Sequence, residues 1–285
     1  MSNLKRRLAE EKFFKLLMQF SAGMIVLALV LLIGSILFRG LPALSWSMLT
    51  ETPKGGYYMG KEGGIANAII GSLYLAFGAT LLAGVLALPV AFYLNAYRRK
   101  NSKFSNFVRL CFDVMWGIPS IVYGAFGFTI MVALGMKTSL GAGIVVVAVV
   151  ILPVIVRTAD EVMMMIPSFL PEASYALGAT RFQTAIRVIF RQCLPGICTA
   201  LLVAFGRAIG DAAAVLFTAG YSDYIPTSLS QSTATLPLAI FFQLGTPFPE
   251  VQERAYAAAL ILTVLILIVS VLARILTGVF KKYRV

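Results

Sequence analysis

Long apolar stretches alternate with shorter polar segments over the whole chain of 285 residues. The apolar stretches cover approximately 17–38, 66–94, 107–134, 140–156, 195–220 and 255–277. Most of them reach or exceed the roughly 20 residues that an α-helix needs to cross a bilayer. Several runs of that length cannot all be buried inside one soluble core. We therefore predict an all-α, polytopic membrane protein with six transmembrane helices.

Glycine and proline lie inside these runs, for example Gly117 and Pro119 in the third. Membrane helices tolerate such residues where neighbouring helices satisfy the freed backbone groups, so the third run is interpreted as one continuous span. The first run includes Phe20–Phe38, which exceeds the roughly 7 to 15 residues of a signal-peptide core. We expect residues 1–16 to be a cytoplasmic segment and 17–285 to be the transmembrane domain.

Composition supports the membrane class and narrows the chemistry. The chain is 59% hydrophobic and 13% charged, whereas soluble domains have roughly 45 to 50% apolar and 25% charged residues. Histidine is absent, which removes the commonest metal ligand and general base. The three cysteines lie inside or beside apolar runs and their number is odd, so no disulfide framework is implied.

The net charge of +12 would suggest nucleic acid as a partner of a soluble protein, but here the positions of the basic residues matter more. Eighteen of the 24 fall at the amino end, in 98–109, in 157–191 and in the tail. The alternate loops hold five, namely Arg39, Lys54, Lys61, Lys137 and Arg254. The positive-inside rule then places both termini in the cytoplasm, and the bilayer, not nucleic acid, is the expected surroundings.

Three loops are long enough to have functions of their own. Two of them, roughly 39–65 and 221–253, are predicted to lie outside, and the first carries Gly55-Gly56-Tyr57-Tyr58. The third is the cytoplasmic stretch from about 157 to 192.

Within this cytoplasmic loop, Ser168 is a candidate cap for a helix that Pro171 begins and Gly178 ends. A second helix follows from about Thr180, and Leu194-Pro195 leads into the fifth span. We predict a short helical hairpin on the cytoplasmic face. By spacing alone, an ordinary amphipathic helix resting on the membrane is the alternative.

The loop resembles that of importer-type ABC permeases, which carry a Glu-Ala-Ala segment, a glycine four residues later, and a hydrophobic-x-Leu-Pro element beyond. Glu172, Ala173 and Gly178 match this pattern in spacing. The departures are Ser174 at the second alanine and, in the later element, Val188, Phe190 and Arg191.

Further segments resemble the phosphate-specific branch of that family and, within it, the PstA-type subunit. They are Gly63-Gly64-Ile65 leading to Gly71-Ser72-Leu73, the Gly-Ile-Pro-Ser-Ile-Val-Tyr-Gly segment 117–124, Arg207-Ala208-Ile209-Gly210-Asp211, the Leu-Pro-Leu-Ala-Ile-Phe segment 236–241, and Leu194-Pro195. The resemblance covers most of residues 60–280. The family usually has glutamate at the position of Asp211.

This resemblance implies a permease subunit of an ATP-driven phosphate importer in a prokaryotic cell membrane. The loop helix would couple the spans to a separate ATPase through Glu172, Ala173, Leu177, Gly178 and Ala179. ATP and Mg²⁺ would be bound by two ATPase subunits, because this chain has no G-x-x-x-x-G-K-[ST] segment and no cofactor of its own is expected. The other expected partners are a second, homologous permease, an extracytoplasmic phosphate-binding protein and inorganic phosphate.

Arg207 is the clearest candidate for contact with the anion, because an ionisable residue inside a span is costly and is functional by default. Its planar fork suits a tetrahedral oxyanion. Asp211 at i+4 would lie on the same helix face and moderate the attraction, or the two would form a structural pair. Arg157, at the inner end of the fourth span, is either a snorkelling residue or part of the pathway's cytoplasmic mouth. Asp113 could accept a hydrogen bond or an arginine from a neighbouring span.

Other classes fit less well. An intramembrane aspartyl protease could use Asp113 and Asp211, but its G-x-G-D motif is missing. A secondary transporter would be expected to show two inverted halves with interrupted helices, and no such internal symmetry is visible. Two closer alternatives share nearly every feature of this sequence: the sister permease of the same complex, and a permease for sulfate, molybdate or another oxyanion. Only the family resemblance favours the PstA-type subunit over them.

Overall fold

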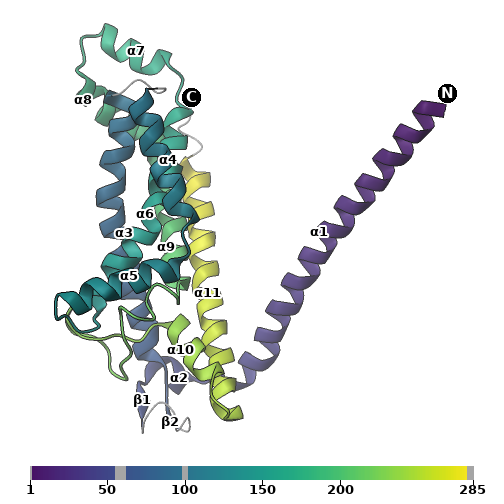
Figure 1. The fold of residues 1–285 in the computed structure, drawn as a ribbon, viewed down its shortest axis with the longest axis vertical. Coiled ribbons are helices and arrows are strands. Elements are labelled where there is room, and N and C mark those ends of the chain that lie inside the picture. The colour runs from purple at the N-terminus through teal and green to yellow at the C-terminus, as the bar shows by residue number, and fades with distance from the viewer. Residues whose placement is uncertain (1, 55–61, 98–101, 281–285) are drawn as a thin grey trace.

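The computed structural model describes residues 2–54, 62–97 and 102–280, which form a helical protein (Figure 1). Two short strands, β1 (Pro53–Lys54) and β2 (Glu62–Gly63), pair antiparallel within the segment 39–65 that was predicted to be the first outer loop. The helices, in chain order, are α1 (Ser2–Ala43), α2 (Trp46–Thr50), α3 (Ala66–Phe92), the π-helix η2 (Tyr93–Tyr97), α4 (Lys103–Gly117), α5 (Ser120–Ala133), α6 (Leu140–Met164), α7 (Phe169–Ala176), α8 (Arg181–Thr184), the π-helix η3 (Ala185–Phe190), α9 (Arg191–Gly210), α10 (Leu236–Leu244) and α11 (Pro249–Phe280).

Among the described residues, five helices are long and apolar enough to cross a membrane. They are Glu10–Ala43, Ala66–Tyr97, Leu140–Met164, Arg181–Gly210 and Pro249–Ile275. The pair α4 and α5 qualifies as a sixth span only if the two helices are taken together. The predicted all-α, polytopic membrane class is thus confirmed, with five to six spans.

The third span differs from the prediction of one continuous helix over 107–134. The chain bends by 94° between α4 and α5. Ile118 is extended (φ −75°, ψ 128°), the conformation that a following proline favours, and Pro119 begins the new direction. Pro119 therefore breaks this span, and the expectation that it would be tolerated inside one helix was wrong.

The fifth span also has other bounds than the predicted 195–220. Its helix is continuous from Arg181 through η3 to Gly210, so the second helix of the predicted hairpin merges with the span. Pro195 lies inside it, just after the π-helical stretch, where irregular backbone bonding is already present. Residues 211–220 are not helical. Likewise, α6 continues two turns beyond the predicted end at 156, to Met164.

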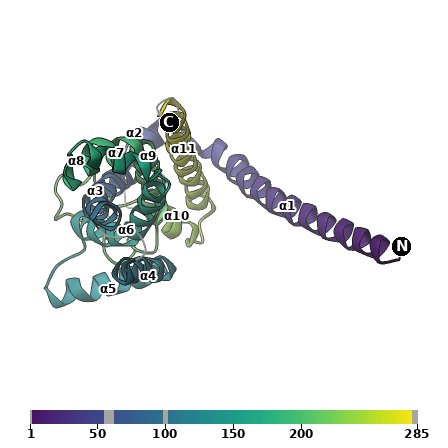
Figure 2. The ribbon, with the colours of Figure 1, turned by 90° about the horizontal axis from the view of Figure 1, so that it is seen from above.

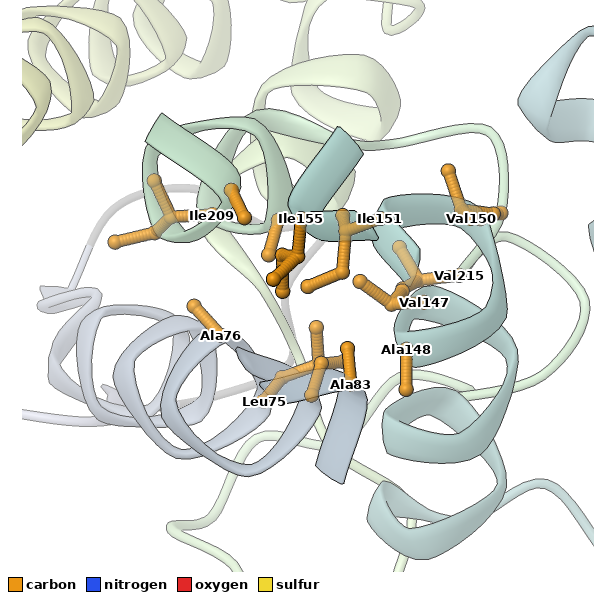
Figure 3. Close-up of a cluster of buried hydrophobic side chains, with 14 of the residues drawn as sticks. Leu75, Ala76, Ala83, Val147, Ala148, Val150, Ile151, Ile155, Ile209 and Val215 are labelled. Atoms are coloured by element: carbon orange, nitrogen blue, oxygen red, sulfur yellow. The ribbon is translucent and has the colours of Figure 1, made fainter. Parts of the chain in front are cut away.

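The core lies where α3, α6 and the end of α9 pack against one another (Figure 3). One face of α3 is lined with small side chains that are fully buried, namely Ala76, Ala79, Ala83 and Ala87. Small residues let the α6 backbone approach closely, as in other membrane helix pairs. Ile151, Ile155 and Val147 of α6 fill the space opposite, and Ile209 of α9 closes it.

Helix α1 projects away from this bundle (Figures 1 and 2). None of its most apolar 18-residue window is buried, and it contacts the rest of the chain at its C-terminal end. There the Arg39 guanidinium donates to the Tyr256 hydroxyl of α11 at 3.0 Å. The predicted N-terminal segment is continuous with this helix from Ser2. The N-terminal end of α1 and the C-terminal end of α11 point to the end of the molecule that carries α7 and α8 (Figure 1).

The region at the opposite end is ordered and partly buried, although it was predicted as two outer loops. Between α9 and α10, backbone bonds attach the chain to the start of α6, for example Ser139 N–H to Thr218 O at 2.9 Å and Leu140 N–H to Gln231 O at 2.8 Å. The buried Asn67 of α3 donates to Ser222 O at 2.7 Å. Gly55-Gly56-Tyr57-Tyr58 lies outside the described residues.

Candidate functional site

Arg207 lies in the last turn of α9, and its side chain is exposed. No ion pair to it occurs within the part of the chain that the structure describes. The space beside the neighbouring Gly206 is empty, since a Cβ added there would meet nothing within 4 Å. Ala208 and Ile209 on the other side of the helix are buried in the core. The core thus fixes the helix, while Arg207 points away from it.

Asp211 does not form the predicted i+4 pair with Arg207, because α9 ends at Gly210 and Asp211 has extended backbone (φ −81°, ψ 115°). Its carboxylate instead accepts a hydrogen bond from the Ala214 N–H at 2.9 Å and shapes the turn that follows. No ion pair between Arg207 and Asp211 is present among the described residues. The i+4 placement and the structural Arg207–Asp211 pair were thus wrong for this conformation. A moderating effect of the Asp211 charge on the anion stays a prediction.

The side chain of Tyr123 stabilises the helix break between α4 and α5. The Tyr123 hydroxyl donates to the Met115 carbonyl at 2.9 Å and so ties the first turn of α5 back to the last turn of α4. Tyr123 also lies close enough to Arg207 to interact with it electrostatically. This role of Tyr123 was not predicted, since the sequence places it only within the segment 117–124 that carries the family resemblance.

Close backbone contact joins the break to the end of α9. A Cβ on Gly124 would lie 2.9 Å from the carbonyl oxygens of both Ala213 and Ala214, so only glycine fits without a shift of the backbone. The segment 117–124 therefore meets the turn that directly follows Arg207–Asp211, although the two stand far apart in the sequence. Pro119 sets the bend, Tyr123 tethers it, and Gly124 allows the contact.

This arrangement places an arginine in the last turn of an apolar helix of span length, beside a bent span. A charged side chain at that depth must face protein or water, since lipid cannot solvate it. The guanidinium has five N–H donors in a fixed fork and suits a bidentate contact with an oxyanion. The exposed, unpaired state of Arg207 is what such a contact requires.

Arg157 has a different environment, since it belongs to a cluster of charged side chains. Its Nε lies 2.8 Å from Asp113 Oδ1, so Asp113 accepts an arginine from a neighbouring helix, one of the two roles considered for it. Arg157 also approaches Asp160 at 3.6 Å and Glu161 at 3.9 Å. With three carboxylates around it, Arg157 is neutralised, and this favours a structural role over a contact with the anion.

Asp160 occupies the centre of this cluster, and its side chain has no exposed surface. Arg109 of α4 binds it with both ends of its fork, through Nε at 2.7 Å and Nη2 at 3.0 Å. Asn95 of η2 adds an amide bond at 2.7 Å. Arg109 was counted in the sequence only as a cytoplasmic charge, although Ser105 and Phe112, four residues before and three after it, mark the same buried face of α4.

At the end of the molecule opposite the strands, α7 stands out from the bundle (Figure 1), and none of its residues is buried. Gly178 ends it with φ +79°, a conformation that favours glycine. The Ala179 N–H binds the Ser174 carbonyl and the Gly178 N–H binds the Tyr175 carbonyl, which is the Schellman arrangement. The predicted end at Gly178 is confirmed. So is the start of the next helix at Thr180, which forms a capping box with Gln183.

Two serines of this loop differ from the expectation: the predicted cap bond of Ser168 is not formed, and Ser174 has a role that was not predicted. Ser168 takes the N-cap position but has helical backbone and makes no side-chain cap bond, and the helix begins at Phe169 and not at Pro171. Ser174 bonds the hydroxyl of Thr184 at 2.9 Å, and Thr184 is fully buried. The departure from the Glu-Ala-Ala pattern at Ser174 thus supplies a link between α7 and α8.

The coupling residues predicted from the resemblance lie on one exposed protrusion. Glu172, Ala173 and Gly178 are exposed, Ala179 is half-buried, and Leu177 exposes 89% of its surface. Other large apolar side chains around α7 and α8 are also exposed, namely Met165, Phe169, Phe182 and Ile186. An apolar protrusion of this kind is typical of a surface that binds another protein.

Comparisons with known proteins agree with this picture. The family model for the binding-protein-dependent transport system inner membrane component matches residues 83–281. The chain is 33% identical to the phosphate transport system permease protein PstA of Yersinia pestis, over 87% of this chain and 83% of that protein. It is 32% identical to phosphate transport system permease protein PstA 2 of Mycobacterium bovis, over 92% and 85% of the two chains.

Solved structures show a similar fold. A chain of the MetNI methionine ABC transporter, in an inward-facing conformation, superposes with a TM-score of 0.63 at 24% identity, covering 75% of this chain and 95% of that one. A chain of a bacterial alginate ABC transporter superposes with a TM-score of 0.59 at 16% identity, covering 90% and 92%. At these identities the likeness concerns the fold alone.

Proposed function

Because the chain belongs to the PstA family of phosphate transport permeases, within the binding-protein-dependent transport system inner membrane components, we propose that it lines half of the anion pathway of an ATP-driven phosphate importer. It is the membrane-spanning permease subunit of that importer. The observation that carries the pathway assignment is Arg207, an exposed arginine without an ion pair in the described chain, beside the break between α4 and α5.

Phosphate would meet Arg207 transiently. A fork of N–H donors binds two phosphate oxygens at once, which gives recognition. A pathway must also release its ion, and one arginine offers a single site of moderate strength. Asp211, fixed in its own turn by Ala214, adds negative charge near the end of α9 and weakens the hold on the anion. Arg157 is assigned to packing at the inner end of α6, because its charge is already balanced by Asp113.

The exposed loop around α7 is assigned to coupling with a separate ATPase subunit. Glu172 and Leu177 would contact that subunit, while Ala173, Gly178 and Ala179 keep the helix slim and end it sharply. The Schellman arrangement at Gly178 and the capping box at Thr180 support this assignment, because they make the protrusion rigid enough to pass on a displacement. No cofactor is assigned to this chain, and ATP and Mg²⁺ would bind to the ATPase pair.

The remaining partners follow from the surfaces left uncovered. A second, homologous permease would cover Arg207 and complete the pathway, because one exposed arginine cannot face lipid. The ordered outer region between α9 and α11 would receive a phosphate-binding protein outside the cell membrane of a prokaryote. The distribution of basic residues supports cytoplasmic positions for both termini and for α7.

The test is uptake of radiolabelled phosphate at low micromolar concentration in cells that lack this gene, with radiolabelled sulfate measured in parallel. Selective loss of phosphate uptake, restored by the wild-type gene, is the expected result. Normal phosphate uptake with loss of sulfate uptake would leave an importer permease but overturn the substrate. Unchanged uptake of both anions would overturn the proposed function.

A further inference from the structure

Helix α4 is attached to the bundle through a narrow strip. Its buried residues are Ser105 and Phe112, and between them the Arg109 side chain is 12% exposed. The spacings of four and three residues place all three on one face of the helix, toward α6. Phe112, with the partly buried Val108 and Met115, makes the apolar contact of α4 with the core. The two-pronged bond between Arg109 and Asp160 is the most deeply buried ion pair of α4 among the described residues.

Asp160 is linked on its other side to the cytoplasmic loop. Asn95 donates to Asp160 Oδ1 at 2.7 Å and lines a cavity of about 230 Å³ beneath α7. The α7 side chains that face this cavity are Pro171, Glu172 and Tyr175. The amide oxygen of Asn95 is buried and has no hydrogen-bond partner. Asn95 therefore lines the cavity under α7 and also contacts Asp160 at the centre of the ion cluster.

We propose that Asp160 is a positioning residue that passes a displacement of α7 on to α4, and through α4 to the helix break beside Arg207. Asn95 and Arg109 are the two links on either side of it. The inference rests on the proposed function, because it requires a permease driven by an ATPase at α7.

The physical reason lies in the geometry and burial of the pair. Two parallel N–H···O bonds fix the relative orientation of guanidinium and carboxylate, so a turn of α6 carries α4 with it. A buried carboxylate cannot be left unpaired without a large penalty, so the link persists during the movement. Nearer the break, Arg157 and Asp113 connect α6 to α4 a second time. The Tyr123 tether then carries the movement across the break to α5.

A chain of contacts shows a route, and energetic coupling along it has to be measured. The experiment uses the whole importer, with both permeases, the ATPase subunits and the phosphate-binding protein, reconstituted in liposomes. The quantity is the number of phosphate ions taken up per ATP hydrolysed. The variants are Asp160→Asn, Asn95→Leu and the charge exchange Arg109→Asp with Asp160→Arg. The matched control is Glu161→Gln, since Glu161 is the next residue on α6, carries the same charge and is exposed.

We expect Asp160→Asn to lower the ratio about tenfold and Asn95→Leu about threefold, while ATP hydrolysis continues and Glu161→Gln keeps the wild-type ratio. Recovery of the ratio in the charge exchange would support the pair as the link. Asn95→Leu removes the amide donor to Asp160 but no charged group, and it keeps approximately the size of the side chain. It therefore tests the link if Asp160→Asn fails to assemble.

A wild-type ratio in Asn95→Leu would overturn the proposal. So would a fall in uptake that matches the loss of assembled complex, because the cluster would then serve stability alone. If wild-type liposomes take up another anion in place of phosphate, the substrate assignment is wrong, and the same ratio is measured with that anion.

Discussion

Replacement of Arg207 by glutamine tests the pathway assignment directly. Glutamine keeps a hydrogen-bond donor but loses the charge and the fork. The side chain is exposed and has no ion pair within the described residues, so its loss should change the folding free energy by no more than about 0.5 kcal/mol. Transport should respond much more strongly than stability.

The size of the effect follows from the bonds that are lost. A hydrogen bond to a charged group contributes about 1.5 to 3 kcal/mol, and 1.4 kcal/mol corresponds to a factor of ten. Arg207→Gln should therefore slow phosphate uptake at low concentration by about 10-fold to 150-fold. Arg207→Lys keeps the charge but lacks the forked guanidinium, so its uptake rate should lie between those of the wild type and Arg207→Gln.

The assay is the initial rate of radiolabelled phosphate uptake, divided by the amount of protein in the membrane. Lys137→Gln is the matched control, because it removes an exposed positive charge from the turn between α5 and α6. Arg207→Gln at a normal amount and a wild-type rate would refute the reasoning. An equal loss in Lys137→Gln would also refute it, since the effect would then follow the overall charge.

Three further predictions concern the loop and the break. Gly124→Ala should destabilise the chain by about 1 to 3 kcal/mol, because the added Cβ would meet two carbonyl oxygens at 2.9 Å. Gly117→Ala should not destabilise it, because a Cβ there meets nothing within 4 Å. Thermal unfolding in detergent measures the stability of both variants. Ser174→Ala should leave the buried Thr184 hydroxyl unpaired and speed amide hydrogen exchange in α8. Ser168→Ala is the control, because the Ser168 hydroxyl makes no cap bond. Equal exchange rates in the two variants would contradict the assigned link. Gly178→Val, at φ +79°, should cost the loop about 1 to 3 kcal/mol and uncouple ATP hydrolysis from uptake; normal coupling would contradict the role of α7.

The spans could be predicted from the sequence because burial in lipid demands long apolar runs, and every predicted run contains helix in the structure. Their ends could not be predicted so well. Residues 157–164 carry three charges, which suggests a loop, yet they continue α6 because Asp160 finds two partners on other helices. Tertiary pairing of a buried charge thus extends a helix past the point where apolar character ends.

The effect of each proline on its helix was also hard to predict, because it too depends on tertiary contacts. Pro89, Pro153 and Pro195 lie inside continuous helices, whereas Pro119 separates two helices by 94°. The residues themselves do not differ, but only the bend at Pro119 is stabilised by contacts far along the chain, where Gly124 meets Ala213 and Ala214. A sequence reading of single prolines has no access to such contacts.

The arginines of the membrane region show where sequence reasoning about function reaches its limit. Arg109, Arg157 and Arg207 all qualify as costly charges near or inside spans, and the sequence ranks them only by depth. The structure separates them by their partners: Arg109 and Arg157 bind carboxylates within the chain, and Arg207 binds none among the described residues. A paired arginine is already neutral and holds helices together, whereas an exposed and unpaired one still needs an anion. The residue left without a partner by its own chain is therefore the one to which substrate contact is assigned.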